Sequence, residues 1–533
     1  MKKSILVMIA VFAAISVSTL HAATTCEGLK GFAMKNVTIT MAQAVGAGEF
    51  TPPLPARGAA PPADAAADGA PAAAPPARGG AAPGRGGAPA VSYRDLPAFC
   101  RVAATLMPVS DSEIRIEVWL PVTGWNGKLE AVGNGAWAGN ISTPALANAL
   151  RAGYAGASTD TGHTGGNPAT FVLGHPEKVI DFAYRSVHEM TVTAKALINA
   201  YYGSAPKFSY FNGCSTGGRQ AITAVQRYPN DFDGVVAGAS AMNVSRLQGN
   251  QAWTGQITHK DEAGYIPATK YPALHAAALN ACDAIDGVKD GVIENPRVCK
   301  FDPKTIQCTG EDSISCLTTP QVEVAKKIYS GVTNSVTGKS IFPGLEPGSE
   351  MGWASLSGAR PMALGVEVYR YLVHQDANWD FATFNADKDI PLAEKVIGPM
   401  MDAMDPNLKP FASHGGKLLM YHGWADPGIS PRNSVNYYQS VVDKLGASNA
   451  SNSIRLFMVP GMGHCSGGDG TDKFDAMAAI DQWVTKGKAP DSIPASHQTR
   501  GVVDKTRPLC AYPKTAQYHG TGSTNDAANF ACK

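Results

Sequence analysis

The sequence lacks an excess of charge of either sign. Its 45 lysine and arginine residues nearly balance 44 aspartate and glutamate residues, which gives a formal net charge of +1. Proteins that bind nucleic acids or anionic membranes by electrostatic attraction carry a basic excess or basic patches. The composition therefore gives no argument for either partner, and its 44% hydrophobic and 17% charged residues are typical of a globular protein.

Long apolar runs are also missing after the first residues. The N-terminal segment MKKSILVMIAVFAAISVSTLHAA has two lysines, an apolar run and small residues at Ala22 and Ala23, which is the pattern of a secretory signal peptide. The apolar run is shorter than the about 20 residues that a membrane-spanning helix needs, so a retained anchor is the weaker alternative. We expect residues 1–22 to be a signal peptide of a secreted or periplasmic protein without a membrane partner.

The cysteines lack the paired C-x2-C spacing of zinc ribbons. There are ten, at positions 26, 100, 214, 282, 299, 308, 316, 465, 510 and 532, and all lie beyond the signal peptide. An even number of cysteines in an exported protein indicates disulfides rather than free thiols. The sequence therefore allows five disulfides and does not favour a zinc site.

A segment poor in large apolar residues runs from about 46 to 91 and consists mainly of Ala, Pro and Gly. Such a segment cannot bury enough apolar surface to offset its loss of conformational entropy on ordering. We therefore predict that residues 46–91 form a disordered linker.

Strand-like and helix-like segments alternate beyond the linker. The strand-like segments are EIRIEVWLP, KLEAV, YAGASTD, FSYFN, FDGVVAGAS, KLLMYHG and IRLFMVPG. This alternation predicts an α/β fold with a mostly parallel sheet. It fades between about Ser245 and Ile390, so we expect an α/β domain interrupted by a large insertion.

The stretch FNGCSTGGRQ contains the G-x-S-x-G pattern of a nucleophile elbow, with the serine at Ser215. A strand-like segment precedes it and a helix-like segment follows, which is the context that the pattern requires. The turn would expose Ser215 and place the Thr216 N–H at the positive end of the helix. We predict that Ser215 is a nucleophile; a glycine-rich turn without catalytic function is the alternative.

A serine nucleophile needs a base and an acid that orients the base. In α/β-hydrolases these follow in the order Ser, Asp or Glu, His, each after a strand. Asp426 follows KLLMYHG and His464 follows IRLFMVPGMG, so we predict that they are the acid and the base. His422, Asp160 and His163 do not fit this order, and we expect them to be structural hydrogen-bonding residues.

Two cysteines adjoin the predicted catalytic pair: Cys214 precedes Ser215 and Cys465 follows His464. If the base reaches the nucleophile, the two cysteines come close together, and a disulfide needs Cα atoms only about 4.4–6.8 Å apart. We predict a bridge that fastens the base to the nucleophile, with two buried thiols as the alternative.

Acyl transfer also needs hydrogen-bond donors for the oxyanion. Thr216 is one candidate, through its backbone N–H. The other is expected in the loop after KLEAV, at Gly133 or Asn134, with Gly135 as the third residue of that loop. These glycines alternatively serve only a tight turn.

The insertion contains the aspartate-rich segment CDAIDGVKDGVIENPRVC, with Asp283, Asp286 and Asp290. Carboxylate and carbonyl oxygens are the ligands that Ca²⁺ prefers, although the spacing is not that of an EF-hand. We predict a calcium site here, and solvated turns are the alternative.

With GCSTGG, WADPG, GMGHC and the aspartate-rich loop, the chain resembles the tannase and feruloyl esterase family over nearly the whole mature sequence. The resemblance implies a secreted serine esterase with an α/β-hydrolase core, residues 23–240 and 396–533, and an inserted lid domain, residues 241–395, that carries a structural Ca²⁺. Members of the family cleave esters of aromatic acids such as gallate and ferulate, and a terephthalate half-ester hydrolase also belongs to it.

The resemblance carries over residue by residue. The triad matches Ser215, Asp426 and His464, and the bridge matches Cys214 and Cys465. The calcium ligands match Asp283, Asp286, Asp290 and the carbonyls of Val288 and Val292.

The leading hypothesis is therefore a hydrolase of small-molecule aromatic esters. The alternatives are a general carboxylesterase or peptidase on the same core, or a non-catalytic secreted binding protein. The lid side chains that select the acyl group are not predicted, because Trp253, Trp353 and Trp379 suit a lid core as well as a substrate platform. The sequence also leaves the oligomeric state open.

Overall fold

A computed structural model describes residues 23–52, 92–166 and 168–533. The predicted signal peptide and residues 53–91 of the predicted linker lie outside the described residues. Phe50, however, is buried, and its ring lies 5.2 Å from that of Tyr93 and 4.6 Å from that of Trp119. The linker was therefore predicted to begin too early, because one large aromatic residue anchors its first part to the folded domain.

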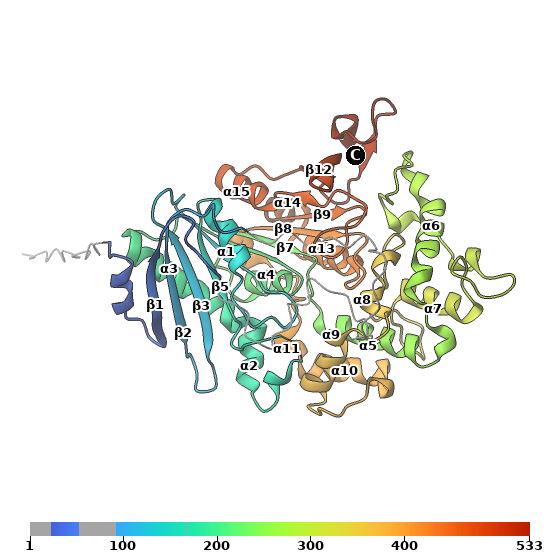
Figure 1. Ribbon diagram of the computed structural model, residues 1–533, viewed down its shortest axis with the longest axis horizontal. Helices are drawn as coiled ribbons and strands as arrows, with labels where there is room; N and C mark the ends of the chain where they lie inside the picture. Colours follow the sequence, from blue (N-terminus) through green and yellow to red (C-terminus); the bar gives the residue numbers. More distant parts are fainter. Residues whose placement is uncertain (1–22, 53–91, 167) are drawn as a thin grey trace, which may run out of the picture.

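A nine-stranded sheet in the order β1-β2-β3-β5-β4-β6-β7-β8-β9 forms the centre of the fold (Figure 1). The strands are β1 (Val37–Val45), β2 (Phe99–Leu106), β3 (Ile114–Pro121), β4 (Lys128–Val132), β5 (Ala155–Thr159), β6 (Phe208–Cys214), β7 (Gly234–Gly238), β8 (Lys417–Gly423) and β9 (Ile454–Val459). β1, β2, β3 and β5 pair antiparallel, and every pair from β5 through β4 to β9 is parallel. The parallel part confirms the predicted sheet and places the carboxyl ends of its strands on one edge.

Helices cover both faces of this sheet. Successive side chains of a strand point to opposite faces, and Phe211 of β6 packs in the cluster of α3 and α4, whereas Tyr210 packs in that of α15. The helices of the core are α1 (Thr143–Arg151), α2 (Pro176–Ile180), α3 (Ser186–Tyr202), α4 (Thr216–Arg227), α13 (Pro431–Leu445), α14 (Ala447–Ser453) and α15 (Ala476–Lys486). α13 belongs to the α3 and α4 face, and α1 to the α15 face.

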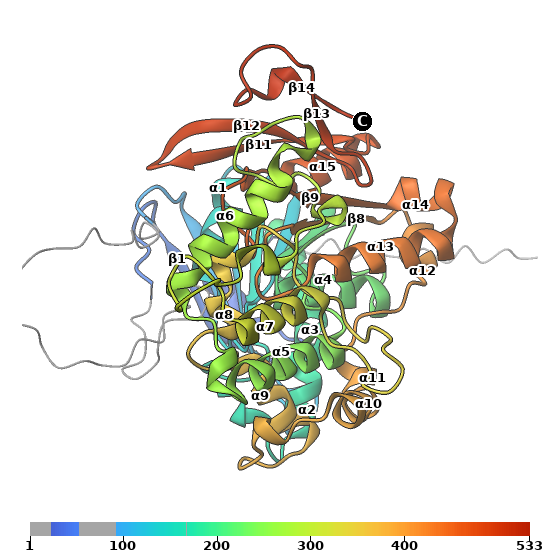
Figure 2. The same cartoon turned by 90° about the vertical axis from the view of Figure 1, so that its right-hand side faces the viewer.

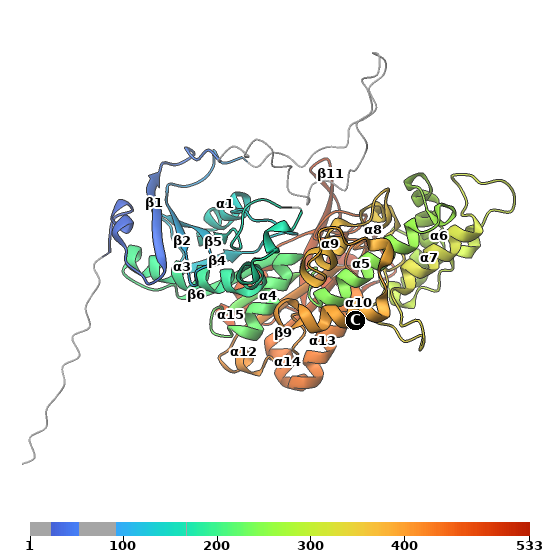
Figure 3. The same ribbon diagram turned by 90° about the horizontal axis from the view of Figure 1, so that it is seen from below.

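The chain between β7 and β8, residues 239–416, forms a helical layer that we call the lid insertion. Its helices are α5 (Val244–His259), α6 (Tyr271–Cys282), α7 (Thr319–Ser330), α8 (Ala354–Ser357), α9 (Ala363–Glu367), α10 (Ala386–Val396), α11 (Gly398–Met401) and α12 (Lys409–Ser413). It contains a hydrophobic cluster of its own around Leu274, Val322 and Trp353. Its helices α6 and α7 lie at the opposite end of the molecule from β1, β2 and β3 (Figures 1 and 3).

The C-terminal part adds small antiparallel sheets that the strand-helix alternation did not predict. They are formed by β10 (Lys473–Phe474), β11 (Ser492–Thr499) and β12 (Val502–Cys510), and by β13 (Ala516–Tyr518) and β14 (Phe530–Cys532). Figure 2 shows these strands above the core and next to the lid insertion. None of the helices in the described parts of the chain has the length and apolar character to cross a membrane.

All ten cysteines lie in the described part of the chain, and all are paired. The bridges are Cys26–Cys100, Cys214–Cys465, Cys282–Cys299, Cys308–Cys316 and Cys510–Cys532. The structure therefore contains as many disulfides as the sequence allows.

Candidate active site

Ser215 lies at the turn between β6 and α4. Its backbone has φ 64° and ψ −121°, a conformation that non-glycine residues adopt only where the surrounding fold imposes it. The turn is so tight that a Cβ on Gly213 would lie 2.6 Å from the carbonyl carbon of Gly217. The strand, turn and helix therefore form the predicted nucleophile elbow, with Ser215 half-buried at its tip.

Asp426 lies in the turn between β8 and α13, residues 424–430, which we call the acid loop, and is fully buried. Its Oδ1 accepts hydrogen bonds from the N–H groups of Gly428 and Ile429, both at 2.9 Å. Its Oδ2 lies 2.7 Å from Nδ1 of His464. Burial alone would raise the pKa of Asp426, but the charge and hydrogen bond of His464 together with His422 hold it well below its usual range. Asp426 is therefore ionised and orients the imidazole of His464.

His464 follows β9 in a loop that we call the base loop, residues 461–472. Its side chain is 32% exposed. The predicted bridge joins the base loop to the elbow, because Cys465 forms a disulfide with Cys214 and their Cα atoms lie 6.0 Å apart. The structure thus brings together the elbow, the acid loop and the base loop.

His422, at the end of β8, is a second imidazole on the acid. It is fully buried, its Nε2 lies 3.1 Å from Oδ2 of Asp426, and its Nδ1 lies 2.8 Å from Oγ of Ser434. Since Nε2 also faces the carbonyl oxygen of Ile429 at 3.2 Å, this nitrogen carries the proton and Nδ1 accepts from the serine hydroxyl. The order of the motifs predicts only a structural hydrogen bond for His422. Its place at the end of β8, four residues before Asp426, was the available indication that it supports the acid.

Two of the predicted oxyanion donors are already used inside the fold, which corrects the expectation for Gly133 and Asn134. The N–H of Gly133 donates to the carbonyl of Asn212 at 2.9 Å, and the N–H of Asn134 donates to Oε1 of Gln220 at 3.0 Å. A Cβ on Gly133 would lie only 2.6 Å from Cα of Gly217. Gly133 therefore lets the loop approach the elbow, and Asn134 fastens the loop to α4.

Two backbone donors next to the elbow are not used in this way. In the chain as far as it is described, the N–H groups of Thr216 and Gly135 have no hydrogen-bond partner. Thr216 opens α4, where the helix dipole favours negative charge. Its hydroxyl donates to the carbonyl of Ala136 at 3.0 Å, which holds the start of the helix against the loop of Gly135.

The other candidates, Asp160 and His163, have partners of their own. Asp160 accepts from the N–H groups of Arg115 and Gly162, both at 2.9 Å, and burial raises its pKa to about 7. Nε2 of His163 lies 2.7 Å from the carbonyl of Trp137, and burial lowers the pKa of His163 to about 4. Both residues therefore stabilise the loops beside the site, as expected.

The aspartate-rich loop of the lid insertion is folded around its own carboxylates. Asp283 accepts from the N–H groups of Asp290, at 3.1 Å, and Gly291, at 3.0 Å. Asp286 accepts from the N–H of Val288 at 3.0 Å, and burial, Asp290 and Asp283 together raise its pKa. The loop thus concentrates negative charge that its own hydrogen bonds do not neutralise.

A cavity lies between this loop and the C-terminal sheet. It is lined by Asp286, Asp290 and Glu294 from the loop and by Lys505 and Arg507 from β12. Nη2 of Arg507 lies 2.5 Å from Oδ2 of Asp290, and burial raises the pKa of Glu294 to about 7. Since two cations face three carboxylates here and Asp283 lies close by, the oxygen-rich donor set fits a hard divalent cation.

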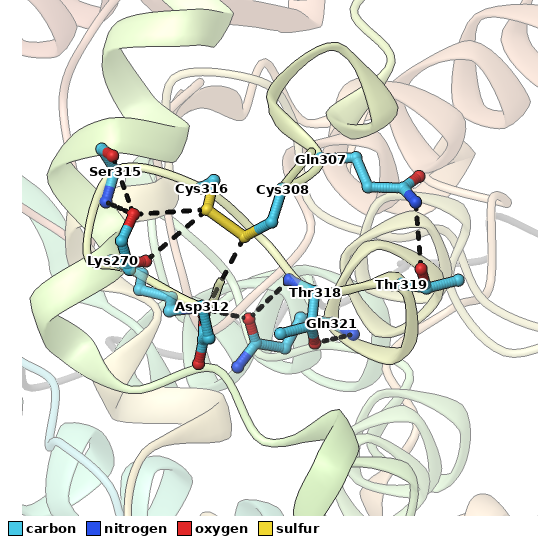
Figure 4. Close-up of a disulfide and its surroundings, with 10 residues drawn as sticks. Lys270, Gln307, Cys308, Asp312, Ser315, Cys316, Thr318, Thr319 and Gln321 are labelled. Atoms are coloured by element: carbon cyan, nitrogen blue, oxygen red, sulfur yellow. Dashed lines mark hydrogen bonds and ion pairs between the residues drawn. A yellow bond between two sulfur atoms is a disulfide. The ribbon is translucent and has the colours of Figure 1, made fainter. Parts of the chain in front are cut away.

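Figure 4 shows a different cluster of metal-ligand types in the lid insertion. Cys308, Asp312 and Cys316 form the one group of three His, Cys, Asp or Glu side chains, within the described residues, whose ligand atoms all lie within 4.8 Å of one another. The two sulfurs form a disulfide, and Lys270 binds both Asp312 and Gln321. This group is therefore not a metal site, and the carboxylates of the aspartate-rich loop are spaced more widely.

Comparison with known sequences places this chain in a family. The family model for tannase and feruloyl esterase matches residues 100–533. An uncharacterized esterase of Xanthomonas campestris is 39% identical over 488 residues, which are 82% of this chain and 84% of that protein. A probable feruloyl esterase B-1 of Aspergillus oryzae is 35% identical over 456 residues, with 82% and 84% covered.

Solved structures agree with the sequence comparison. A crystal structure of an esterase from Aspergillus oryzae has a TM-score of 0.84 and 32% identity, and feruloyl esterase B from the same organism has 0.82 and 31%; each match covers 95% of this chain and 99% of the other. Tannin acyl hydrolase from Aspergillus niger, at 23% identity, shares the fold with a TM-score of 0.74, over 94% and 92% of the two chains. These matches confirm the predicted α/β-hydrolase fold. The chain therefore belongs to the tannase and feruloyl esterase family and is a carboxylic ester hydrolase.

Proposed function

We propose that this protein is a serine esterase that hydrolyses esters of aromatic acids, with Ser215 as nucleophile, His464 as base and Asp426 as the acid that orients the base. One observation carries the proposal. His464, whose Nδ1 lies 2.7 Å from Oδ2 of Asp426, belongs to a loop that a disulfide fastens to the elbow of Ser215.

The reaction follows from these roles. Oγ of Ser215 attacks the ester carbonyl carbon while Nε2 of His464 takes the hydroxyl proton. The tetrahedral intermediate collapses, the bond to the alcohol oxygen breaks, and His464 returns the proton to the leaving alcohol. Water then attacks the acyl-enzyme by the same route, which releases the acid and restores the Ser215 hydroxyl. Asp426 remains ionised throughout and stabilises the imidazolium.

The oxyanion of each tetrahedral intermediate needs two donors. We assign them to the N–H groups of Thr216 and Gly135, which flank the elbow. The fold favours this pair because the neighbouring N–H groups of Gly133 and Asn134 are occupied.

The substrate class rests on the relatives. The matching family is described as tannase and feruloyl esterase, and relatives at 31–35% identity carry the name feruloyl esterase B. We therefore propose hydroxycinnamic, gallic or related aromatic acids as the acyl group, on a small-molecule ester.

A turnover panel of galloyl, feruloyl, caffeoyl and terephthaloyl esters tests this proposal, with simple alkyl esters and a peptide amide as comparison substrates. We expect kcat/KM to be highest for an aromatic ester and to vanish in Ser215→Ala. Faster turnover of alkyl esters would indicate a general carboxylesterase, and absence of any turnover by folded protein would reject the enzyme.

We also propose that the aspartate-rich loop binds a structural Ca²⁺. Asp283, Asp286 and Asp290 would supply carboxylate oxygens, and Val288 and Val292 would supply carbonyls. The ion would neutralise carboxylates that Lys505 and Arg507 leave in excess, and it would stabilise the lid insertion without entering the reaction.

We propose further that the mature protein is secreted or periplasmic. Five disulfides in one chain are typical of oxidising compartments. N-terminal sequencing of exported protein checks the expected cleavage after residue 22, and an intact N-terminus on the exported protein would contradict it.

A further inference from the structure

His275, on α6 of the lid insertion, lies between two carboxylates from different parts of the chain. Its Nδ1 lies 2.8 Å from Oε2 of Glu350, and its Nε2 lies 3.3 Å from Oδ2 of Asp469. A neutral imidazole carries one N–H, so only the doubly protonated ring donates to both. Burial alone would lower the pKa of His275, but hydrogen bonds and charge from Asp469 and Glu350 outweigh it and raise the pKa to about 9. The ring is therefore cationic at neutral pH.

We call the two contacts of His275, with Glu350 and with Asp469, the bridge. On one side of this bridge, Glu350 reaches the acid loop. Glu350 is fully buried and also accepts from the Tyr329 hydroxyl, at 2.7 Å, and the N–H of Gly348, at 2.8 Å. It opens the turn Glu350–Gly352, and a Cβ on Gly352 would lie 2.5 Å from Cγ of Pro427. Since Pro427 directly follows Asp426, the turn that His275 fixes packs on the acid loop.

The Asp469 side reaches the base loop, five residues after His464. This loop contains five glycines between residues 461 and 470, and glycine-rich backbone loses much entropy when it is ordered. The disulfide of Cys465 holds one part of the loop. The hydrogen bond and charge of His275 lower the pKa of Asp469, which also faces His497 and Lys505. The bridge thus holds the part of the loop that the disulfide does not reach.

We propose that His275 is a positioning residue for ester hydrolysis: by binding Glu350 and Asp469 it ties the lid insertion to the loops that carry Asp426 and His464. The proposal rests on the proposed function, since it assigns to the lid a part in aligning the acid and the base. Loss of the bridge would let the base loop drift from Ser215 without removing any group that touches the substrate.

The test compares His275→Gln and Asp469→Asn, singly and together, with the wild-type enzyme. His188→Gln is the matched control, because Nδ1 of His188 also lies 2.8 Å from a carboxylate, that of Asp231, but on α3 of the core. On an ester that the wild-type enzyme turns over, each test variant should lower kcat about tenfold, well within the ~10²-fold that misplacement by 1 Å can cost. KM should change less than kcat, and the double variant should be no worse than the poorer single variant, because both changes break one bridge.

Hydrogen exchange of peptides covering residues 461–472 gives a readout that needs no substrate. Exchange should become faster in both test variants and stay unchanged in His188→Gln. Asp469 is largely exposed, so Asp469→Asn should fold even if His275→Gln does not. Unchanged kcat and unchanged exchange in folded Asp469→Asn would overturn the proposal. An inactive wild-type enzyme would instead count against the proposed function, while the exchange result would still decide on the bridge.

Discussion

The acid loop and the base loop hold Asp426 and His464 in opposite ways. Asp426 is fully buried, and four donors from its own loop, from His422 and from His464 surround its carboxylate. His464 is 32% exposed in a glycine-rich loop. That loop is fastened to other parts of the molecule by a disulfide and by the contact of Asp469 with His275.

This difference follows from burial. A buried carboxylate must have its hydrogen bonds satisfied, and the same hydrogen bonds fix its orientation. A base that exchanges protons with substrate has to remain accessible, so it cannot be enclosed as the acid is. The disulfide to the elbow and the contact with the lid insertion hold the base loop in place, as hydrogen bonds hold the carboxylate of Asp426.

Replacement of the proposed triad residues should lower turnover more than any other change. Ser215→Ala and His464→Ala should each lower kcat by about 10⁴–10⁶-fold, and Asp426→Asn by about 10⁴-fold, because the three groups act as a unit. Circular dichroism and thermal unfolding should show folded protein in each case. Turnover close to the wild-type rate in either alanine variant would remove that residue from the triad.

The second prediction concerns the tether of the base loop. Replacement of Cys214 and Cys465 by alanine should lower kcat about 10²-fold, with a smaller change in KM, because the base is then free to move by about 1 Å. It should also lower the free energy of unfolding by about 2–4 kcal/mol.

The matched control is the alanine pair at Cys308 and Cys316, whose bridge lies in the lid insertion and spans 8 residues. This pair should leave kcat nearly unchanged. Equal losses of kcat in both cysteine pairs would show that the bridge at the elbow acts only through general stability.

The third prediction concerns the acid. His422→Leu removes one donor from Asp426 and should lower kcat about tenfold, and it should destabilise the fold by about 1–3 kcal/mol, since Ser434 loses its acceptor. Ser434→Ala, which leaves the Nε2 donor in place, should cost less in kcat. If Ser434→Ala reduces kcat as much as His422→Leu, the hydrogen bond to Asp426 is not the cause.

Removal of the proposed Ca²⁺ should have the smallest effect on turnover. Chelation should lower the melting temperature by several degrees, because a ligand that binds only the folded state stabilises it, and it should reduce kcat only slightly. Asp286→Ala should abolish this sensitivity, whereas Asp312→Ala, in the disulfide loop, should keep it. An unchanged melting temperature together with absence of bound metal would leave the aspartates as solvated turns.

Much of the core could be predicted from the sequence because its features are local. Each parallel strand is a short apolar run, and each predicted triad residue follows such a run. The pairing of Cys214 with Cys465 follows from their neighbours in sequence.

The rest depends on contacts between distant segments. The Gly133 and Asn134 donors were misassigned because their partners, Asn212 and Gln220, come from other elements. The bridge of His275 joins residues 75 and 194 positions further along the chain, at Glu350 and Asp469. The predicted start of the linker, at residue 46, was wrong because composition does not reveal that one residue, Phe50, packs on the core.

We propose that Ser215 is activated as a nucleophile by His464 and Asp426. Reaction with a fluorophosphonate followed by peptide mapping decides whether Ser215 is activated. We expect one adduct per chain, on Ser215 in the peptide containing FNGCSTGGRQ, with no adduct in Ser215→Ala and slow formation in His464→Ala. Folded protein that stays unlabelled, or that carries the adduct on another residue, would contradict the claim.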